Sequence, residues 1–454
     1  MANQMYDISE VLGGKRLTFL TLGCKLNFAE TSSVRDCLLA LGAVEAGKDD
    51  EADLLLVNTC SVTEVADHKC RQAIHRLHRR HPGAAVVVMG CYAQLQPEQI
   101  AAIEGVDLVI GTEQKGQVVE LIAECLALKA GAGCSQTAGR VVCTAGRDIK
   151  SFAPSCSRGE RTRCFLKVQD GCNYYCTYCT IPMARGRSRN GSVASLTAQA
   201  CEAARLGARE IVITGVNIGD FGRSTGETFL ELIRSLDAVE GIDRYRISSI
   251  EPNLLTTDVI RFCAESRSFM PHFHIPLQSG SDEVLRLMHR RYDTSFFRSK
   301  VQEVLEYLPD AFLGIDVIVG MRGETAELFE ETFSFLEALP FAELHVFSYS
   351  ERPGTRALDI PHTVSPADKH ERSARLLALS ERKRRDFYAR FAGSRRPVLW
   401  EHPRPGQPLR GFTDNYIRVE LPAGTSAQPT DGSIQECRLG DFTPDAQCLL
   451  AIPL

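Results

Sequence analysis

Short apolar runs alternate with amphipathic stretches along the first quarter of the chain. Four of the runs are almost purely apolar and too short for helices, which is typical of strands buried on both faces of a parallel sheet. Apolar positions between 34 and 41 recur at helical spacing and predict a helix from about Ala29. The alternation predicts an α/β domain whose strands are residues 17–22, 54–58, 85–89 and 107–110.

The same alternation resumes after residues 131–154, a stretch that is rich in Gly, Ala, Ser and Thr and lacks apolar periodicity. We interpret this stretch as a linker. Six strand-like runs follow it, each succeeded by a helical pattern or a long loop, and six such units predict an open barrel of parallel strands. The runs are residues 164–169, 210–216, 245–250, 272–277, 312–319 and 343–348.

A basic helix and several short alternating stretches end the chain. Between Lys369 and Arg396 there are ten Lys and Arg residues but three acids. After Arg396, short runs separated by Gly and Pro predict a small antiparallel barrel. The predicted fold class is α/β, with an amino-terminal parallel-sheet domain (15–130), a linker (131–155), a central partial (β/α)6 barrel (156–388) and a carboxyl-terminal small antiparallel β-barrel (389–454).

Composition narrows the class of protein. The chain has 454 residues and a formal net charge of -5, so attraction to nucleic acid must come from local patches. Its seventeen cysteines accompany no apolar leader segment, which favours a reducing, cytoplasmic setting and metal chemistry over disulfides. No apolar run approaches the length of about eighteen residues that spans a bilayer, so we expect no membrane partner.

Three cysteines in the centre of the chain give the clearest chemical signal. Cys172, Cys176 and Cys179 follow the first predicted barrel strand at the spacing C-x-x-x-C-x-x-C. Four thiolates close a 4Fe-4S cluster, whereas three leave one iron open to a substrate or cofactor, so the motif predicts an enzyme. A structural zinc site or simple burial is the alternative, although a zinc site needs a fourth ligand at comparable spacing and none lies nearby downstream.

A second trio is spread over the amino-terminal domain. Cys24, Cys60 and Cys91 each follow one of its first three predicted strands. Because parallel strands end at the same edge of a sheet, where open α/β sheets bind their ligands, these thiols can converge on one point. The trio predicts a second three-thiolate cluster, and packing of buried cysteines is the alternative.

Both trios lie in segments that resemble one enzyme family. The central trio is followed by Ile181-Pro182 and Arg185-Gly186 and resembles the radical S-adenosylmethionine superfamily. Around the other trio, Gly23-Cys24-Lys25-Leu26-Asn27, Asn58-Thr59-Cys60 and Gly90-Cys91 resemble the cluster domain of the methylthiotransferases in that superfamily. The resemblance implies two 4Fe-4S clusters, with S-adenosylmethionine at the open iron of the central one. It also implies that the amino-terminal cluster handles sulfur.

Polar residues after other predicted strands are candidate ligands for S-adenosylmethionine or substrate, because barrel enzymes bind at the carboxyl ends of their strands. They are Gly215, Asn217, Glu251 and Gln278. Helix capping is the alternative role for such positions. The chain departs from the resembling family at Met321-Arg322, where members usually carry Phe-Pro.

Three regions are candidates for contact with RNA. We interpret the basic helix predicted over 64–81 as a solvated face, with RNA backbone contact as the alternative. The run at 382–385 fits phosphate contact, with a solvated connecting helix as the alternative. The terminal barrel resembles the TRAM module, an RNA-binding β-barrel, in which Phe412, Tyr416 and Arg418 either contact RNA or fill the barrel.

The residues around Cys24 bear on the substrate. The segment from Thr21 to Asn27 most resembles the MtaB-type branch, which methylthiolates C2 of N6-threonylcarbamoyladenosine at position 37 of tRNA. The isopentenyladenosine branch usually has Gln-Met after the cysteine, and the branch that acts on a ribosomal-protein aspartate has Pro-Lys. The resemblance implies two partners, the tRNA anticodon stem-loop and a flavodoxin- or ferredoxin-like electron donor. The substrates of the other two branches stay alternatives, as do a two-cluster electron carrier and a non-catalytic RNA-binding protein.

Overall fold

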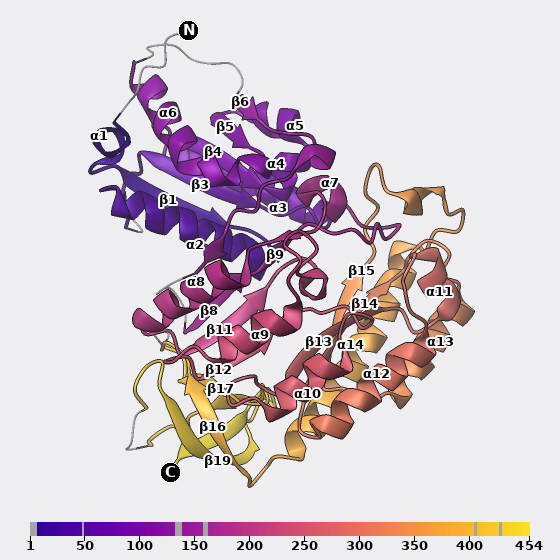
Figure 1. Cartoon of the computed structure of the whole chain (residues 1–454). Coiled ribbons are helices and arrows are strands. Elements are labelled where there is room, and N and C mark those ends of the chain that lie inside the picture. The colour runs from indigo at the N-terminus through magenta and orange to yellow at the C-terminus, as the bar shows by residue number, and fades with distance from the viewer. Residues whose placement is uncertain (1–6, 48–49, 132–138, 158–161, 404–405, 426–428) are drawn as a thin grey trace.

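The computed structural model describes residues 7–47, 50–131, 139–157, 162–403, 406–425 and 429–454 (Figure 1). The chain passes from an amino-terminal α/β domain through a barrel of parallel strands to a small closed barrel next to its carboxyl terminus. Within these ranges, no helix combines the length and the apolarity needed to cross a membrane.

The amino-terminal domain is built on a parallel sheet of six strands in the order β2-β1-β3-β4-β5-β6. The strands are β1 (Arg16–Thr21), β2 (Val44–Glu45), β3 (Leu54–Thr59), β4 (Ala85–Gly90), β5 (Val106–Ile110) and β6 (Arg140–Val142). The helices are α1 (Ile8–Leu12), α2 (Lys25–Ala40), α3 (Glu64–Arg80), α4 (Cys91–Leu95), α5 (Pro97–Ala101) and α6 (Val118–Gly131), with 3-10 turns η1 (Glu113–Gln117) and η2 (Gly146–Asp148).

Alternate residues of the central strands supply two cores, one on each face of this sheet. Leu55 and Val86 pack with α3 and α5, whereas Leu54 and Val87 pack with α1, α2 and α6. Burial on both faces explains why β3 and β4 are apolar runs in the sequence.

Two details of this domain differ from the sequence prediction. Helix α2 begins at Lys25, directly after Cys24, and not at about Ala29. The sequence pattern misses its first turn because buried polar residues such as Asn27 and Glu30 interrupt the apolar period. Strand β6 lies in the stretch interpreted as a linker and pairs with β5 at the edge of the sheet. Its three residues are too few and too exposed to form an apolar pattern.

The central region contains the six parallel strands that the sequence predicts, in two groups, β8-β11-β12 and β13-β14-β15. Parallel bridges at Tyr245–Phe269 and Ser249–His274 connect the groups, and β7 lies antiparallel to β8 at one edge. The strands are β7 (Ser155–Cys156), β8 (Arg163–Lys167), β9 (Gln169–Asp170), β10 (Arg189–Asn190), β11 (Glu210–Thr214), β12 (Arg244–Ile247), β13 (His272–Gln278), β14 (Phe312–Val319) and β15 (Glu343–Ser348).

Helices cover the outside of this open barrel (Figure 1). They are α7 (Ile181–Arg185), α8 (Val193–Arg205), α9 (Phe229–Asp237), α10 (Thr257–Glu265), α11 (Asp282–Leu287), α12 (Thr294–Tyr307), α13 (Ala326–Ala338) and α14 (Pro366–Ala389), with turns η3 (Ile218–Asp220) and η4 (Arg356–Asp359). On the other face of the strands, Phe28 and Ala29 of α2 pack against Phe165 and Val212. The amino-terminal domain therefore contributes to the inside of the barrel.

The small barrel is closed in the order β16-β17-β18-β20-β19 and docks at the amino ends of the central strands. Its strands are β16 (Arg395–Trp400), β17 (Arg410–Thr413), β18 (Arg418–Glu420), β19 (Ile434–Phe442) and β20 (Leu449–Pro453). Arg246 of β12 donates to the carbonyl of Thr413 at 2.9 Å, and Arg244 donates to that of Phe412 at 3.0 Å. The carboxyl ends of the central strands stay clear of this contact.

Two aromatic residues that the sequence offered for RNA stacking are occupied by this docking. Phe412 and Tyr416 stack on each other at 4.7 Å, and the guanidinium of Arg163 lies 4.8 Å from the Phe412 ring. Tyr416 also packs on His272, the first residue of β13, at 4.3 Å. Both rings therefore connect the two barrels, a role that sequence position alone could not reveal, while Arg418 is exposed.

The basic run at 382–385 on α14 is also engaged by the protein itself. Arg382 pairs with Glu337 at 2.8 Å and Arg385 with Glu381 at 2.6 Å. Lys383 donates to the carbonyl of Glu337 at 2.7 Å, and Arg384 pairs with Glu343. These contacts favour the connecting-helix interpretation over phosphate contact.

Candidate active site between two sets of cysteines

The amino-terminal trio lies at the carboxyl ends of three neighbouring strands. Cys24 follows β1, Cys60 follows β3, and Cys91 follows β4 as the first residue of α4. A Cβ added to Gly23 would lie 2.8 Å from the Cβ of Cys60, so this approach requires glycine, which also adopts a φ of 113° here. Burial, and then the neighbouring Cys91 and Cys24, raise the pKa of the Cys60 thiol to about 12. The structure brings the three thiols to one edge of the sheet.

A fourth cysteine, Cys70 of α3, lies near this trio. Its thiol donates to the carbonyl of Cys60 at 3.4 Å and is buried in the apolar core under the sheet. Burial also raises its pKa, to about 11. Cys70 is therefore a packing residue of this core.

The central trio occupies the loop between β9 and α7. The amide of Cys179 donates to the carbonyl of Cys176 at 3.0 Å, and Tyr175 adopts a left-handed φ of 52°. Burial, reinforced by the neighbouring Cys176, raises the pKa of Cys172 to about 11 and that of Cys179 to about 12. Nη1 of Arg290 donates to the sulfur of Cys176 at 3.2 Å. The thiols of Cys172 and Cys179 are therefore protonated near neutral pH, so a metal would bind there with release of their protons.

Gly215 and Asn217 lie against Gln169, three residues before the central trio begins. A Cβ on Gly215 would lie 2.9 Å from the carbonyl oxygen of Gln169, and the amide of Asn217 donates to its Oε1 at 2.8 Å. The side chain of Asn217 is buried, and neither its oxygen nor its nitrogen has a hydrogen-bond partner among the described residues. A buried amide without a partner fits a polar ligand such as S-adenosylmethionine.

Glu251 and Gln278 approach the loop that carries the central trio from other strand ends. Glu251 pairs with Arg290, the residue that donates to Cys176, and burial raises the pKa of this carboxyl despite that partner. Gln278 is the last residue of β13, adopts a φ of 73°, and lines a cavity together with Cys179. All four strand-end candidates therefore lie at the carboxyl end of the barrel, around the central trio.

Residues next to both trios line one cavity of about 220 Å³. Val62 and Thr63 follow Cys60, and residues 178–181 include Cys179. The ends of β13, β14 and β15 complete its wall with Gln278, Asp316, Ile318 and residues 347–350. A group bound in this cavity would lie against Cys179 on one side and against the residues that follow Cys60 on another.

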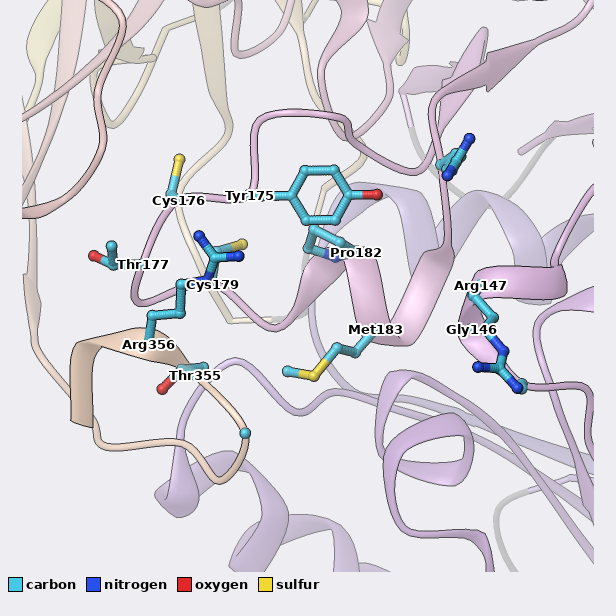
Figure 2. A pocket seen from close by; sticks show the side chains of 13 residues that line it. Gly146, Arg147, Tyr175, Cys176, Thr177, Cys179, Pro182, Met183, Thr355 and Arg356 are labelled. Atoms are coloured by element: carbon cyan, nitrogen blue, oxygen red, sulfur yellow. The ribbon is translucent and has the colours of Figure 1, made fainter. Parts of the chain in front are cut away.

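A second cavity, of about 420 Å³, opens beside Cys176 and Cys179 (Figure 2). Tyr175 and Met183 contribute apolar surface, and three arginines, Arg147, Arg187 and Arg356, contribute charge. The described residues that line it include no acid. This cavity therefore suits an anionic or acidic partner close to the central trio.

Arg185 connects the two halves of the site. It is buried and donates to Asn27 at 2.7 Å, to Glu30 at 2.9 Å and to Asp170 at 3.0 Å. Burial lowers the pKa of Arg185, but Glu30, Cys91, Asp170 and Cys24 outweigh it and raise that pKa well above its ordinary value, so the guanidinium lies near the amino-terminal trio. The motif Arg185-Gly186 was visible in the sequence, but its contact with the other domain was not.

Sequence reasoning missed a polar cluster on the inner face of three barrel strands. Nε2 of His274 lies 2.6 Å from Oδ1 of Asp316, and Nδ1 of His345 lies 3.2 Å from the same oxygen. Two imidazoles and one carboxylate are ligands that a cation could use. The distance of 2.6 Å between His274 and Asp316 is, however, that of a hydrogen bond within the cluster. These residues are 42 and 29 positions apart, so only the strand register brings them together.

Comparison with known proteins agrees with this architecture. Residues 16–111 match the uncharacterized protein family UPF0004, and residues 166–336 match the radical SAM superfamily. Among solved structures, the radical S-adenosylmethionine methyltransferase TsrM from Kitasatospora setae has a TM-score of 0.54 at 14% identity, over 76% of this chain and 77% of that one. That likeness shows the fold.

Curated relatives define the family more closely. The threonylcarbamoyladenosine tRNA methylthiotransferase MtaB of Bacillus subtilis is 36% identical over 89% of each chain. MtaB of Aquifex aeolicus is 34% identical over 89% of this chain and 96% of its own. The tRNA-2-methylthio-N(6)-dimethylallyladenosine synthase of Desulfotalea psychrophila is 32% identical over 90% of this chain and 93% of its own.

A radical S-adenosylmethionine enzyme is thus the class that the barrel and its matching domain define. The chain belongs to the methylthiotransferase family of that class, in the MtaB branch. Enzymes of this family use S-adenosylmethionine and carry two 4Fe-4S clusters.

Proposed function

We propose that the protein adds a methylthio group to C2 of N6-threonylcarbamoyladenosine at position 37 of tRNA. The observation that carries the proposal is the cavity of about 220 Å³ lined from beside both cysteine trios, in a chain of the MtaB branch. One site can then present a sulfur source and a radical source to the same base.

Cys172, Cys176 and Cys179 hold one 4Fe-4S cluster in this proposal, and Cys24, Cys60 and Cys91 hold the other. When bound, the cofactors supply reductive cleavage of S-adenosylmethionine to a 5'-deoxyadenosyl radical, sulfur for insertion, and the methyl group. Each trio contributes three thiolates, which leaves room for one further ligand at each cluster.

Other residues orient these groups. Arg290 holds the sulfur of Cys176 and is itself held by Glu251, which fixes the direction of its hydrogen bond. Gly215 leaves space beside the loop, while Asn217 and Gln278 offer amide groups to S-adenosylmethionine. Arg185 fixes the two domains to each other next to both trios.

The partners proposed are the tRNA anticodon stem-loop and a flavodoxin- or ferredoxin-like electron donor, which places the enzyme in the cytoplasm with its tRNA. The arginine-lined cavity beside Cys176 and Cys179 supports approach of an acidic redox protein. We assign residues 389–454 to a TRAM-like RNA-binding domain and residues 156–388 to the radical domain. The amino-terminal cluster domain is then 15–130, with 131–155 as the connection.

Deletion of the gene tests the substrate. Mass spectrometry of tRNA nucleosides should show that the methylthio group on threonylcarbamoyladenosine is lost and that the unmodified nucleoside accumulates. Re-expression of the Cys60→Ala variant should fail to restore it, whereas the parent restores it. Loss of methylthio-isopentenyladenosine instead, or an unchanged tRNA profile, would contradict the proposal.

A further inference from the structure

Buried charged side chains form a network at the interface between the amino-terminal domain and the barrel, and their charges do not balance. The cations are Lys115, Lys167, Arg185 and Arg189, and the acids are Glu30 and Asp170. Each of these side chains is less than a tenth exposed. In the part of the chain that the structure describes, no other carboxylate lies within ion-pair distance of the four cations. The interface network therefore holds an excess of positive charge.

Hydrogen bonds to the backbone satisfy donors of this network without cancelling its charge. Arg189 donates to the carbonyl oxygens of Arg185 at 2.6 Å and of Arg187 at 3.1 Å. These carbonyl groups are neutral, and a buried charge without a counter-charge is costly. The excess therefore points to an anionic group beside the network that the carboxylates of the network do not supply.

Asn27 connects the network to the amino-terminal trio. Nη2 of Arg185 donates to Oδ1 of Asn27 at 2.7 Å, and the thiol of Cys24 lies 3.6 Å from the same oxygen. Nδ2 of Asn27 donates at 3.0 Å to the carbonyls of Leu22 and Thr59, at the ends of β1 and β3. The guanidinium of Arg185 and the sulfur of Cys24 are therefore neighbours across one amide group.

A cluster bound by this trio has the charge that the network lacks. Three thiolates carry more negative charge than an oxidised 4Fe-4S core carries positive charge, so a cluster on Cys24, Cys60 and Cys91 is anionic. Addition of an electron makes it more negative. A buried cation acts strongly on such a group, because the protein interior screens charge less than water does.

We propose that the interface network supplies the counter-charge of the amino-terminal cluster and raises the reduction potential of that cluster. The inference rests on the proposed function, which places a cluster on this trio. The cations favour the reduced cluster over the oxidised one, because the reduced form carries the larger negative charge. Arg185 and Lys115 are then positioning residues that act through their charge and do not touch the sulfur atoms.

The test is a potentiometric titration with dithionite as the electron donor, followed by electron paramagnetic resonance. It uses the full chain with the three cysteines of the central trio changed to alanine, so that only the amino-terminal cluster is titrated. Arg185→Met and Lys115→Met each remove a cation and should lower the midpoint potential. Glu30→Gln removes an acid and should raise it. Lost packing in these variants would not reverse the shift with the sign of the charge.

Controls separate charge from damage to the site. Lys115→Arg keeps the charge and should keep the potential of the parent, and its comparison with Lys115→Met carries the test if Glu30→Gln does not fold. Arg140→Gln removes an exposed cation of the same domain and should leave the potential unchanged. Loss of iron from Lys115→Met with retention in Lys115→Arg would also support a counter-charge.

Shifts of the same sign in Lys115→Met and Glu30→Gln, or no shift in either, would overturn the inference. A parent protein that binds the amino-terminal cluster but makes no methylthiolated RNA would contradict the proposed function alone. A parent protein that binds no iron at this trio would overturn both.

Discussion

Gly23 shows how a single residue determines the sulfur site. Its missing side chain lets the loop after β1 approach Cys60, and its positive φ turns the chain so that Cys24 can take the N-cap position of α2. The nearest atoms to a Cβ at this position are the Cβ of Cys60 at 2.8 Å, Nδ2 of Asn27 at 3.0 Å and the sulfur of Cys60 at 3.2 Å. A side chain there would displace a thiol from the trio.

The variant Gly23→Ala should therefore lose iron from the amino-terminal site alone. Reconstituted parent protein should contain about eight irons, and the variant about four, with the absorbance of one cluster. Gly14→Ala is the matched control, because Gly14 also has a positive φ of 70° but no atom lies within 4 Å of its added Cβ. It should lose about 1 kcal/mol of stability and no iron. A full iron content in Gly23→Ala would contradict this account of the trio.

At the scale of elements, helix α2 holds the amino-terminal domain to the barrel through buried charges. Glu30 of α2 pairs with Lys115 at 2.6 Å, with Lys167 of β8 at 2.9 Å and with Arg185 of α7 at 2.9 Å. All four side chains are almost fully buried. Asp170 also faces Lys167 at 2.7 Å and Arg185 at 3.0 Å, so removal of Glu30 leaves three buried cations with one buried acid, which is costlier than loss of a surface pair.

Glu30→Gln should destabilise the protein by about 3–5 kcal/mol, because it removes the acid paired with buried Lys115 and leaves Lys167 and Arg185 to share Asp170. A lowered thermal unfolding midpoint measures the effect. Glu124→Gln removes an acid of the same domain whose pair with Arg140 is exposed, and it should cost about 0–1 kcal/mol. Equal midpoints for the two variants would show that the buried network does not hold α2 in place.

The same network predicts a dependence on pH. The neighbouring cations outweigh burial and hold the pKa of Glu30 and of Asp170 well below their usual range. A lowered pKa contributes stability that is complete above the unfolded values, about 4.3 for Glu and 3.9 for Asp, and that is lost as pH falls. The difference in unfolding midpoint between the parent and Glu30→Gln, measured on the apoproteins, should shrink as pH falls from about 6 to about 3. A constant difference would contradict these directions.

Strands and the central motif could be predicted from the sequence, whereas several helix and surface roles could not. Apolar runs such as Phe312–Val319 are mostly buried strands, so their apolar pattern predicts them directly. Helix α2 hides Asn27 and Glu30 in a polar interface, which breaks the apolar period. Tyr416 faces another domain, and an aromatic side chain carries no mark of which surface it will cover.

For the whole molecule, the two basic helices differ in what their charges contact. The sequence favoured α14 for phosphate contact, but Arg382 and Arg385 are paired with acids. On α3, Arg76 and Arg79 are exposed, and neither has an ion-pair partner in the part of the chain that the structure describes. Helix α3 also begins just after Val62 and Thr63, which line the cavity between the trios. Arg76 and Arg79 lie about three to four turns along this helix from the cavity, so they suit contact with tRNA backbone at a distance from the base to be modified.

The double variant Arg76→Gln, Arg79→Gln should weaken tRNA binding and reduce the dependence of log affinity on log salt by about one to two units. Fluorescence anisotropy at several salt concentrations measures both quantities. Arg382→Gln with Arg385→Gln is the matched control and should change them little, because those charges are already neutralised. The reverse ranking would place the RNA on α14.

The central claim is a division of labour between two cysteine trios that serve one base. The most direct measurement is an anaerobic reaction of reconstituted enzyme with S-adenosylmethionine, a reductant and an anticodon stem-loop carrying N6-threonylcarbamoyladenosine. Liquid chromatography with mass spectrometry would quantify both 5'-deoxyadenosine and the methylthiolated nucleoside. We expect both products with the parent, 5'-deoxyadenosine without methylthiolation for Cys60→Ala, and neither for Cys176→Ala. Methylthiolated product from Cys60→Ala would contradict it.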